Sequence, residues 1–383
     1  MKLPEEKVKT LIDLMNSMTQ SVIPPQQPII EMFELAMDEK MLDYLLKIGT
    51  TEYTMDQLKD VYVEMYGEGW EEFKDELLLM SFVHPVSNER ADIYELSPIF
   101  PGWVEFYTSG ETNEKRIAII EKFMEFWAVL KKMNKFPYRQ LSDYKAEKAR
   151  KQGAAPKTTV YPSTGSREIK LEKPLDSKQV VLSKGDVYSI LEKNKDSIGV
   201  GNCFCRTHKK FTTGDDCDLG IPQEACFAVG AIAEQILAQG TGRRLTFEEA
   251  CDMLEEFEKK GCIHTAFHYK NDANYEEIVI CNCCKDCCLL YSGYLQGGLS
   301  KVYTRASYKP EIVDESKCVG CNLCGKYCPT EATYYDKDKK TLVFDYKICI
   351  GCGQCAAQCK FDVRKMVPDQ RDVFVKTRKK VIE

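Results

Sequence analysis

Cysteine is confined to the second half of this 383-residue chain. All 19 cysteines lie at or after Cys203, and many stand only two or three residues apart. This number exceeds what core packing normally uses, and closely spaced thiols in a reducing compartment are metal ligands before they are disulfide partners. The division predicts a domain boundary, with the chemistry of the protein in its back half.

Two cysteine runs near the carboxyl end share the spacing C-x2-C-x2-C-x3-C. The first consists of Cys318, Cys321, Cys324 and Cys328, and the second of Cys349, Cys352, Cys355 and Cys359. Spacings of two residues let one short loop supply three corners of an iron-sulfur cube. The alternative is zinc, but a four-cysteine zinc site uses two separate pairs, so the spacing counts against it.

Residues 308–367 resemble the bacterial two-cluster [4Fe-4S] ferredoxins. The resemblance implies a ferredoxin-like fold with two [4Fe-4S] clusters that carry single electrons. It also implies that the fourth cysteine of each run crosses over. One cluster would take Cys318, Cys321, Cys324 and Cys359, and the other Cys349, Cys352, Cys355 and Cys328. Lys360 stands where the family has a proline, which leaves the ligands in place.

Eleven further cysteines lie upstream and follow no ferredoxin spacing. Thr246 and Glu249 form a capping box that begins a helix, and Gly261 ends it. Cys251 and Cys262 lie on or just after this helix, where we expect ordinary buried residues. The other nine are candidate ligands: Cys203, Cys205, Cys217, Cys226, Cys281, Cys283, Cys284, Cys287 and Cys288.

These nine positions predict one or two further [4Fe-4S] clusters. A zinc site of four cysteines, or of three cysteines and one histidine, is an alternative, as are free redox-active thiols. If residues 281–288 were helical, their cysteines would occupy two faces and straddle two centres. A helix over residues 223–239 would have to bring Cys226 beside them.

Several residues near these cysteines are candidates for metal binding or for adjusting the potential of a cluster. His208 is the histidine best placed as a ligand, whereas the residues around His264 and His268 favour a turn over a metal-binding helix. Arg206 and Lys285 would raise the potential of a neighbouring cluster by offsetting the charge of its reduced state. The arrangement over residues 180–366 resembles ferredoxin-fused iron-sulfur proteins of anaerobes, which implies redox work without naming a substrate.

The front half has a different character. Residues 1–144 carry 15 Lys and Arg against 26 Asp and Glu, a balance that repels polyanions. Apolar spacing predicts a helix over residues 29–48, and helices from Thr54 and over residues 70–82 precede two extended pieces. This order resembles a winged helix. Its third helix is acidic, which counts against DNA binding through that face.

Residues 145–178 reverse the charge, with nine basic and four acidic residues among glycines and prolines, and we interpret them as a linker. The sequence therefore predicts a multidomain α+β protein. Its parts are an acidic helical, winged-helix-like domain (1–144), this basic linker, a cysteine-rich α+β domain (179–307) and a two-cluster ferredoxin domain with a basic tail (308–383). A helix over residues 112–134 should pack its apolar stripe in the first core.

The predicted function is relay of single electrons between the ferredoxin domain, the upstream clusters and a partner oxidoreductase or flavoprotein. The linker and the tail residues Lys376–Lys380 would dock an acidic partner. The alternatives are a redox-sensing transcriptional regulator and a reductase whose upstream cluster has an open iron site. A homo-oligomer is left open.

Other classes of function find no support in the sequence. The chain lacks the apolar stretch of a secretory signal and any run of ~18 apolar residues, so we expect a cytoplasmic protein without a membrane span. It also lacks the glycine motifs that cradle phosphates and the motifs of serine and zinc hydrolases. No catalytic residue is assigned, and we expect an electron-transfer subunit more than a self-contained enzyme.

Overall fold

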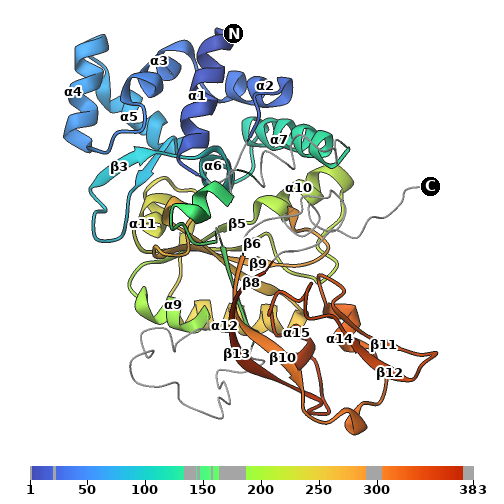
Figure 1. Ribbon diagram of the computed structural model, residues 1–383. Coiled ribbons are helices and arrows are strands. Elements are labelled where there is room, and N and C mark those ends of the chain that lie inside the picture. The colour runs from blue at the N-terminus through green and yellow to red at the C-terminus, as the bar shows by residue number, and fades with distance from the viewer. Residues whose placement is uncertain are drawn as a thin grey trace.

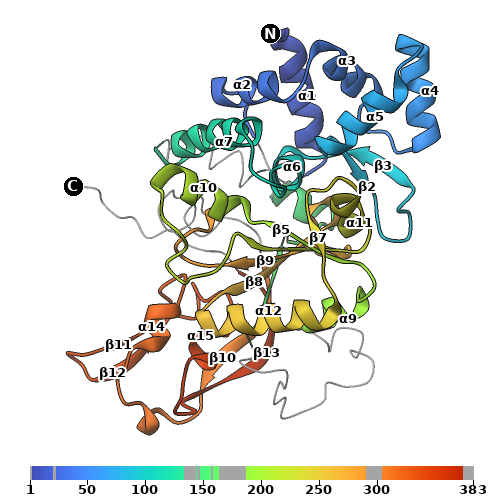
Figure 2. The same ribbon diagram turned by 180° about the vertical axis from the view of Figure 1, so that it is seen from behind.

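A computed structural model describes residues 2–19, 23–132, 144, 147–156, 158–163, 187–289 and 304–373. Figures 1 and 2 show the amino-terminal helices on one side of a central sheet and helices α12 (Phe247–Lys260) and α15 (Gln354–Ala357) on the other. The hairpin of β11 (Thr333–Asp336) and β12 (Thr341–Phe344) extends from the end of the molecule opposite the amino-terminal helices.

The amino-terminal region is mainly helical, with one small antiparallel sheet of order β1-β3-β2. Its helices are α1 (Glu5–Ser17), α2 (Gln27–Ala36), α3 (Glu39–Ile48), α4 (Met55–Tyr66), α5 (Trp70–Leu79), α6 (Val104–Thr108) and α7 (Glu114–Lys132), with an irregular turn at Ile99–Trp103. The strands are β1 (Tyr53–Thr54), β2 (Val83–Pro85) and β3 (Ile93–Leu96). The winged-helix interpretation stays a prediction, and Glu71 and Glu72 on α5 are exposed.

The single helix expected over residues 29–48 is two helices. The Asp38 carboxylate accepts a hydrogen bond from the Met41 backbone N–H at 2.8 Å and caps α3. An aspartate at this position satisfies an N–H that has no partner within its helix, so a new helix begins there. Apolar spacing alone does not reveal the break, because both helices bury their stripes in the same core.

The amino-terminal core includes residues of the cysteine-rich region. Phe204 and Leu289 belong to it, and the rings of Phe123 and Phe204 meet edge to face at 5.5 Å. The Asn202 backbone N–H also donates to the Ser109 carbonyl at 2.7 Å. The helices are thus packed directly onto the segment that carries the first candidate ligands.

An eight-stranded sheet, of order β13-β10-β4-β8-β9-β6-β5-β7, forms the centre of the protein. Its strands are β4 (Thr158–Tyr161), β5 (Ile198–Asn202), β6 (Glu224–Val229), β7 (Arg243–Arg244), β8 (Ile263–His268), β9 (Glu277–Cys283), β10 (Thr304–Ile312) and β13 (Arg364–Val373). Helices α9 (Val187–Lys193), α10 (Phe204–Thr213), α11 (Gly230–Ala238) and α12 accompany it. Thr246 and Glu249 cap α12 as predicted, and Gly261 ends it at φ +102°.

Part of the predicted linker is a buried strand of this sheet. Strand β4 pairs antiparallel with β8 and parallel with β10, and all four of its residues are buried. Two threonines, a valine and a tyrosine in succession favour a strand, although prolines follow and precede them. The segment 145–178 thus differs from a simple tether at these residues, and residues 164–178 lie outside the described ranges.

The helix expected over residues 223–239 is wrong in part, and the helix considered over residues 281–288 does not form at its start. Residues 224–229 form β6 before α11 begins at Gly230, and residues 277–283 form β9. The run EIVIC is rich in β-branched residues, which favour a strand. Cys226 and Cys281 lie opposite each other in the antiparallel β6–β9 pair.

The carboxyl-terminal region continues the central sheet. Strand β10 crosses the predicted boundary at residue 308 and pairs with β13 along its length. Between them lie α14 (Leu323–Tyr327), the hairpin of β11 (Thr333–Asp336) and β12 (Thr341–Phe344), and α15. Short 3-10 turns occupy Tyr269–Asn271 and Glu315–Lys317. Within the described residues, no helix is both long and apolar enough to cross a membrane.

Candidate iron-sulfur and metal centres

One set of four cysteines surrounds a small enclosed space in the carboxyl-terminal region. Cys328, Cys349, Cys352 and Cys355 are all buried and line a cavity of about 20 Å³. The backbone N–H of Ala332 donates to the Cys328 sulfur at 3.1 Å, and that of Gly351 to the Cys349 sulfur at 3.4 Å. The structure therefore joins the last cysteine of the first run to the second run. We refer to these four residues as the inner set.

The outer set, Cys318, Cys321, Cys324 and Cys359, lies nearer the surface. Cys321 is exposed, and the other three are half-buried. Val319, between the first two, exposes 61% of its area. Arg364 is buried and acts electrostatically on both Cys324 and Cys355, so this cation lies between the two sets. Burial nevertheless raises the pKa of Cys355 to about 12.

Six of the nine upstream cysteines form a closed ring of neighbouring thiols. Its order is Cys203, Cys205, Cys288, Cys283, Cys281 and Cys226, which again contacts Cys203. Strands β6 and β9 supply three of these residues, and the start of α10 supplies two. Alternation along β9 places Cys281 and Cys283 on one face. We call this group the six-cysteine ring.

Hydrogen bonding within the ring separates the thiol pKa values. Cys205 and Cys226 contact Cys203 and hold its pKa well below the ordinary value. The same contacts, together with burial, raise the pKa of Cys205 and Cys226 well above it. These contacts favour the thiolate form at Cys203, and thiolates are the form that binds iron.

The ring borders a cavity of about 100 Å³ between the amino-terminal region and the sheet. Phe100, Glu105 and Phe106 line it from the amino-terminal side, and all six ring cysteines line it as well. Burial raises the pKa of Glu105 to about 8, and its carboxyl accepts a hydrogen bond from the Gly102 N–H at 2.9 Å. Burial therefore favours the protonated form of this carboxyl in the wall of the cavity.

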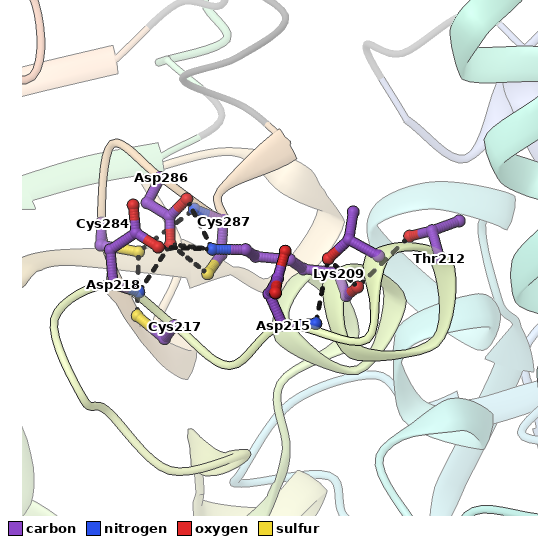
Figure 3. Close-up of polar contacts among 9 residues, drawn as sticks. Lys209, Thr212, Asp215, Cys217, Asp218, Cys284, Asp286 and Cys287 are labelled. Carbon is purple, nitrogen blue, oxygen red and sulfur yellow. Dashed lines mark hydrogen bonds and ion pairs between the residues drawn. The ribbon is translucent and has the colours of Figure 1, made fainter.

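The other three upstream cysteines gather in a second place. Cys217, Cys284 and Cys287 meet the carboxylate of Asp286, and the ligand atoms of all four residues lie within 4.8 Å of one another. Figure 3 shows the sulfur atoms and the Asp286 carboxylate converging, with Lys209 approaching from α10. We call this the cysteine-aspartate group. The nine candidates thus divide into six and three, a division that their spacing does not predict.

Arg206 is a buried cation beside both groups. It exposes 4% of its area, and its Nη2 donates to the Asn282 carbonyl at 2.6 Å. Electrostatic interactions connect it with thiols of the ring and of the cysteine-aspartate group. Its Nε and Nη1 atoms have no hydrogen-bond partner among the described residues. Buried charged donors of this kind require an anion, and a thiolate-held iron-sulfur cluster supplies one. The residues therefore fit such a cluster.

Buried polar residues next to the ring cysteines of β9 contact one another. His264 is buried, with Nδ1 2.7 Å from Asn282 Oδ1 and Nε2 3.2 Å from Glu258 Oε1. Asn282 also donates to the Ala225 carbonyl. His264 and His268 lie four residues apart on a strand, about 13 Å along it, and so form no metal pair. His208 is half-buried and contacts Thr212, outside both cysteine groups.

Sequence reasoning missed the supporting residues Glu258, Asn282 and Gln354. Gln354 donates to the Cys262 carbonyl at 2.6 Å and to Ser163 Oγ at 2.8 Å. It thereby connects α15 with the end of α12. The only sequence signal for Asn282 and Gln354 is that each lies between candidate ligands. Cys251 and Cys262 are buried and belong to neither group, although Cys262 Sγ is 3.8 Å from Arg206.

The ring and the inner set share one apolar cluster. Cys283 and Cys288 of the ring pack in it with Cys352 of the inner set. Ile263, Ile350, Val160 and Ala306 fill the remaining space, and Cys281 packs against the cluster. Among the described residues, one cluster of buried side chains therefore joins the two groups of ligands.

Comparison with known proteins identifies one part of the chain. Residues 317–363 match the family described as 4Fe-4S dicluster domain. No curated protein and no solved structure matches the chain. The matched residues include every cysteine of the inner and outer sets. The match supports an iron-sulfur electron-transfer role for this part of the chain. The carboxyl-terminal region of this protein is therefore a ferredoxin-like 4Fe-4S domain.

Proposed function

We propose that this protein relays single electrons between its ferredoxin-like domain and an iron-sulfur cluster held by the six-cysteine ring, in the service of a partner oxidoreductase. The observation that carries the proposal is the apolar cluster shared by Cys283, Cys288 and Cys352. Electron tunnelling falls steeply with distance, so ligands of two centres packed together favour transfer between them. Iron-sulfur clusters held by thiolates supply one-electron chemistry at such positions.

The outer set, the inner set and the ring differ in exposure, and this difference indicates where electrons would enter or leave the protein. The outer set includes the exposed Cys321, the inner set is buried, and the ring borders the cavity between the sheet and the amino-terminal region. Electrons from a docked protein would enter or leave at the outer set. The basic tail Lys376–Lys380, proposed for docking, lies outside the described residues.

The ring is well suited to hold a cluster. Its six thiols exceed the four that one [4Fe-4S] cube requires, and Arg206 places positive charge beside them. Backbone donors contribute too, since the Leu289 N–H donates to the Cys205 sulfur at 3.4 Å. Hydrogen bonds to ligand sulfur and nearby cations both stabilise the reduced form of a cluster.

Iron content tests the proposal directly. We expect anaerobically purified protein to hold about twelve irons in cubane clusters, rather than the about eight of the ferredoxin-like domain alone. A Cys203→Ser, Cys226→Ser, Cys281→Ser triple variant should fall to about eight, because it leaves three ring thiols, fewer than the four that one cube requires. Cys251→Ala, a buried cysteine outside both groups, is the matched control. About eight irons in wild type and ring variant alike would contradict a ring cluster.

A reductase is the second candidate function, and the cavity beside the ring favours it. A space of about 100 Å³ can hold a small molecule, and Glu105, whose pKa burial raises to about 8, lies at its wall. Reduction of a bound molecule needs both electrons and protons. The ring cluster and Glu105 would supply them if one iron had an open coordination site.

Cyanide tests for this open site. Added to the dithionite-reduced protein, it should change the EPR signal of the ring cluster and leave the signals of the ferredoxin-like domain unchanged. The ferredoxin-like clusters, with four thiolates each, are the internal control in the same sample. An unchanged ring signal would eliminate the reductase and leave the electron relay in place.

A further inference from the structure

We propose that Cys217, Cys284, Cys287 and Asp286 bind one tetrahedral divalent metal ion, zinc by the nature of the donors, separate from the iron-sulfur clusters. The Cys217 and Cys284 sulfur atoms are 3.7 Å apart, and the Cys287 sulfur is 3.2 Å from Asp286 Oδ2. Thiolates bind zinc at about 2.3 Å, so two of them on a tetrahedral ion stand about 3.8 Å apart. The spacing in the cysteine-aspartate group therefore suits ligands that share a single ion.

The ferredoxin-like domain provides a comparison within the same structure. Each cysteine of a cube binds a different iron, so its ligands stand farther apart than those of one ion. Among the described residues, the cysteine-aspartate group alone brings three or more ligand atoms within 4.8 Å of one another. Neither the inner set, the outer set nor the ring is as compact. The structure thus distinguishes this group from the cluster sites.

Local sequence explains how the group forms. Cys284 and Cys287 have the C-x2-C spacing of many zinc sites, in the turn that follows β9. The Cys287 N–H donates to the Cys284 sulfur at 3.3 Å. Cys217 comes from the loop after α10, in a turn closed by the Gly220 N–H bond to its carbonyl at 2.7 Å. A pair from one turn and a single ligand from another loop are brought together by the fold.

The fourth ligand, Asp286, is held in position from outside the group. Lys209 Nζ contacts both of its carboxylate oxygens, at 2.8 and 3.0 Å, and the Asp218 N–H donates to it at 2.9 Å (Figure 3). Hydrogen bonds from an outer shell commonly orient carboxylate ligands. Zinc with three thiolates and a carboxylate has a net charge of about −2, which Lys209 and the buried Arg206 offset.

The position of the ion indicates what it does. Ring cysteines Cys283 and Cys288 flank Cys284 and Cys287 directly in the sequence. An ion bound to Cys284 and Cys287 would therefore fix the turn between them. This turn presents Cys283 and Cys288 to the ring. Zinc has no redox chemistry, so it would order this turn without taking part in electron transfer. Its role is structural support of the neighbouring cluster site.

Metal analysis of anaerobic holoprotein and two lysine variants tests the proposal. We expect about one zinc per chain beside the cluster iron in wild type. Lys209→Met should weaken zinc binding by about 10–100-fold, the usual cost of losing an outer-shell partner, as measured by competition with a chelating indicator. Lys210→Met is the matched control, because its exposed ion pair with Asp216 lies outside the group.

Ligand variants decide between zinc and a cluster. Cys217→Ser should remove zinc and retain the iron and sulfide of the ferredoxin-like domain, and Asp286→Asn provides a milder substitution if the serine variant does not fold. Cobalt(II) in place of zinc should show thiolate-to-cobalt charge-transfer bands that Cys217→Ser abolishes. The Cys203→Ser, Cys226→Ser, Cys281→Ser triple variant should lose the ring iron while keeping zinc, which separates this site from the proposed ring cluster. Fully iron-loaded wild type without zinc, or loss of cubane iron in Asp286→Asn with no zinc in either protein, would overturn the proposal.

Discussion

Replacing Arg206 with methionine should lower the reduction potential of the ring cluster by on the order of 100 mV. The guanidinium is buried and acts on thiols of the ring. At an effective dielectric constant of ~20, a unit charge about 8 Å from an added electron stabilises it by about 2 kcal/mol. For a one-electron couple, in which a tenfold change corresponds to 59 mV, this energy is on the order of 100 mV. EPR-monitored potentiometry measures the shift.

Two further variants separate charge from packing. Arg206→Lys retains the positive charge and should keep most of the potential, although the bond to the Asn282 carbonyl is altered. Lys210→Met removes an exposed charge on the same helix and should leave the potential unchanged, because water screens it. A potential that does not move in Arg206→Met would show that no redox-active cluster lies beside this residue.

The parts of the site that the sequence predicts are those built within one loop. In the inner set, three of four cysteines come from residues 349–355, and their spacing alone indicates an iron-sulfur loop. The capping box at Thr246 is likewise a local pattern, and α12 begins where it predicts. In both cases the interacting groups are separated by a few residues, so chain geometry restricts their arrangement.

The division of the upstream cysteines depends on contacts that no local pattern contains. Cys226 meets Cys281 because β6 and β9 pair in one register, and a shift by one residue would turn these thiols to the other face. Cys217 reaches Cys284 across 67 residues. The alternation in Cys281-Asn282-Cys283 was a signal for a strand, and the C-x2-C pair within residues 284–287 was a signal for the proposed separate metal site. Overlap of the two patterns in eight residues concealed both.

The central strand β4 shows why the domain division was difficult to predict. Four residues of β4 join the sheet between β8 and β10, so the cysteine-rich region and the ferredoxin-like domain share one sheet. The basic charge and the prolines of residues 145–178 indicated a linker. They gave no indication of this short strand. The shared sheet brings Ile350 and Cys352 against Cys283 and Cys288. The proposed electron transfer between the two groups depends on this arrangement.

Loss of the inner cluster should disconnect the ring from the ferredoxin-like domain. In a Cys349→Ala, Cys352→Ala double variant, half of the inner set is missing, so the cluster between the exposed outer set and the ring should be lost. With a reduced two-cluster ferredoxin as donor, we expect reduction of the ring cluster to fall to the background rate. Rapid freeze-quench EPR follows this reaction, because it records each cluster signal over time.

The same variant must retain the ring cluster for this result to be informative. Dithionite with low-potential mediators should still reduce that cluster at equilibrium, since mediators do not need the inner cluster as an intermediate. Cys251→Ala removes a buried thiol that belongs to neither the ring nor the inner set. This variant should transfer electrons at the wild-type rate. If the double variant lacks the inner cluster and yet the protein donor reduces the ring at the wild-type rate, electrons enter the ring by another surface. The apolar cluster around Ile263 and Ile350 would then have a packing role alone.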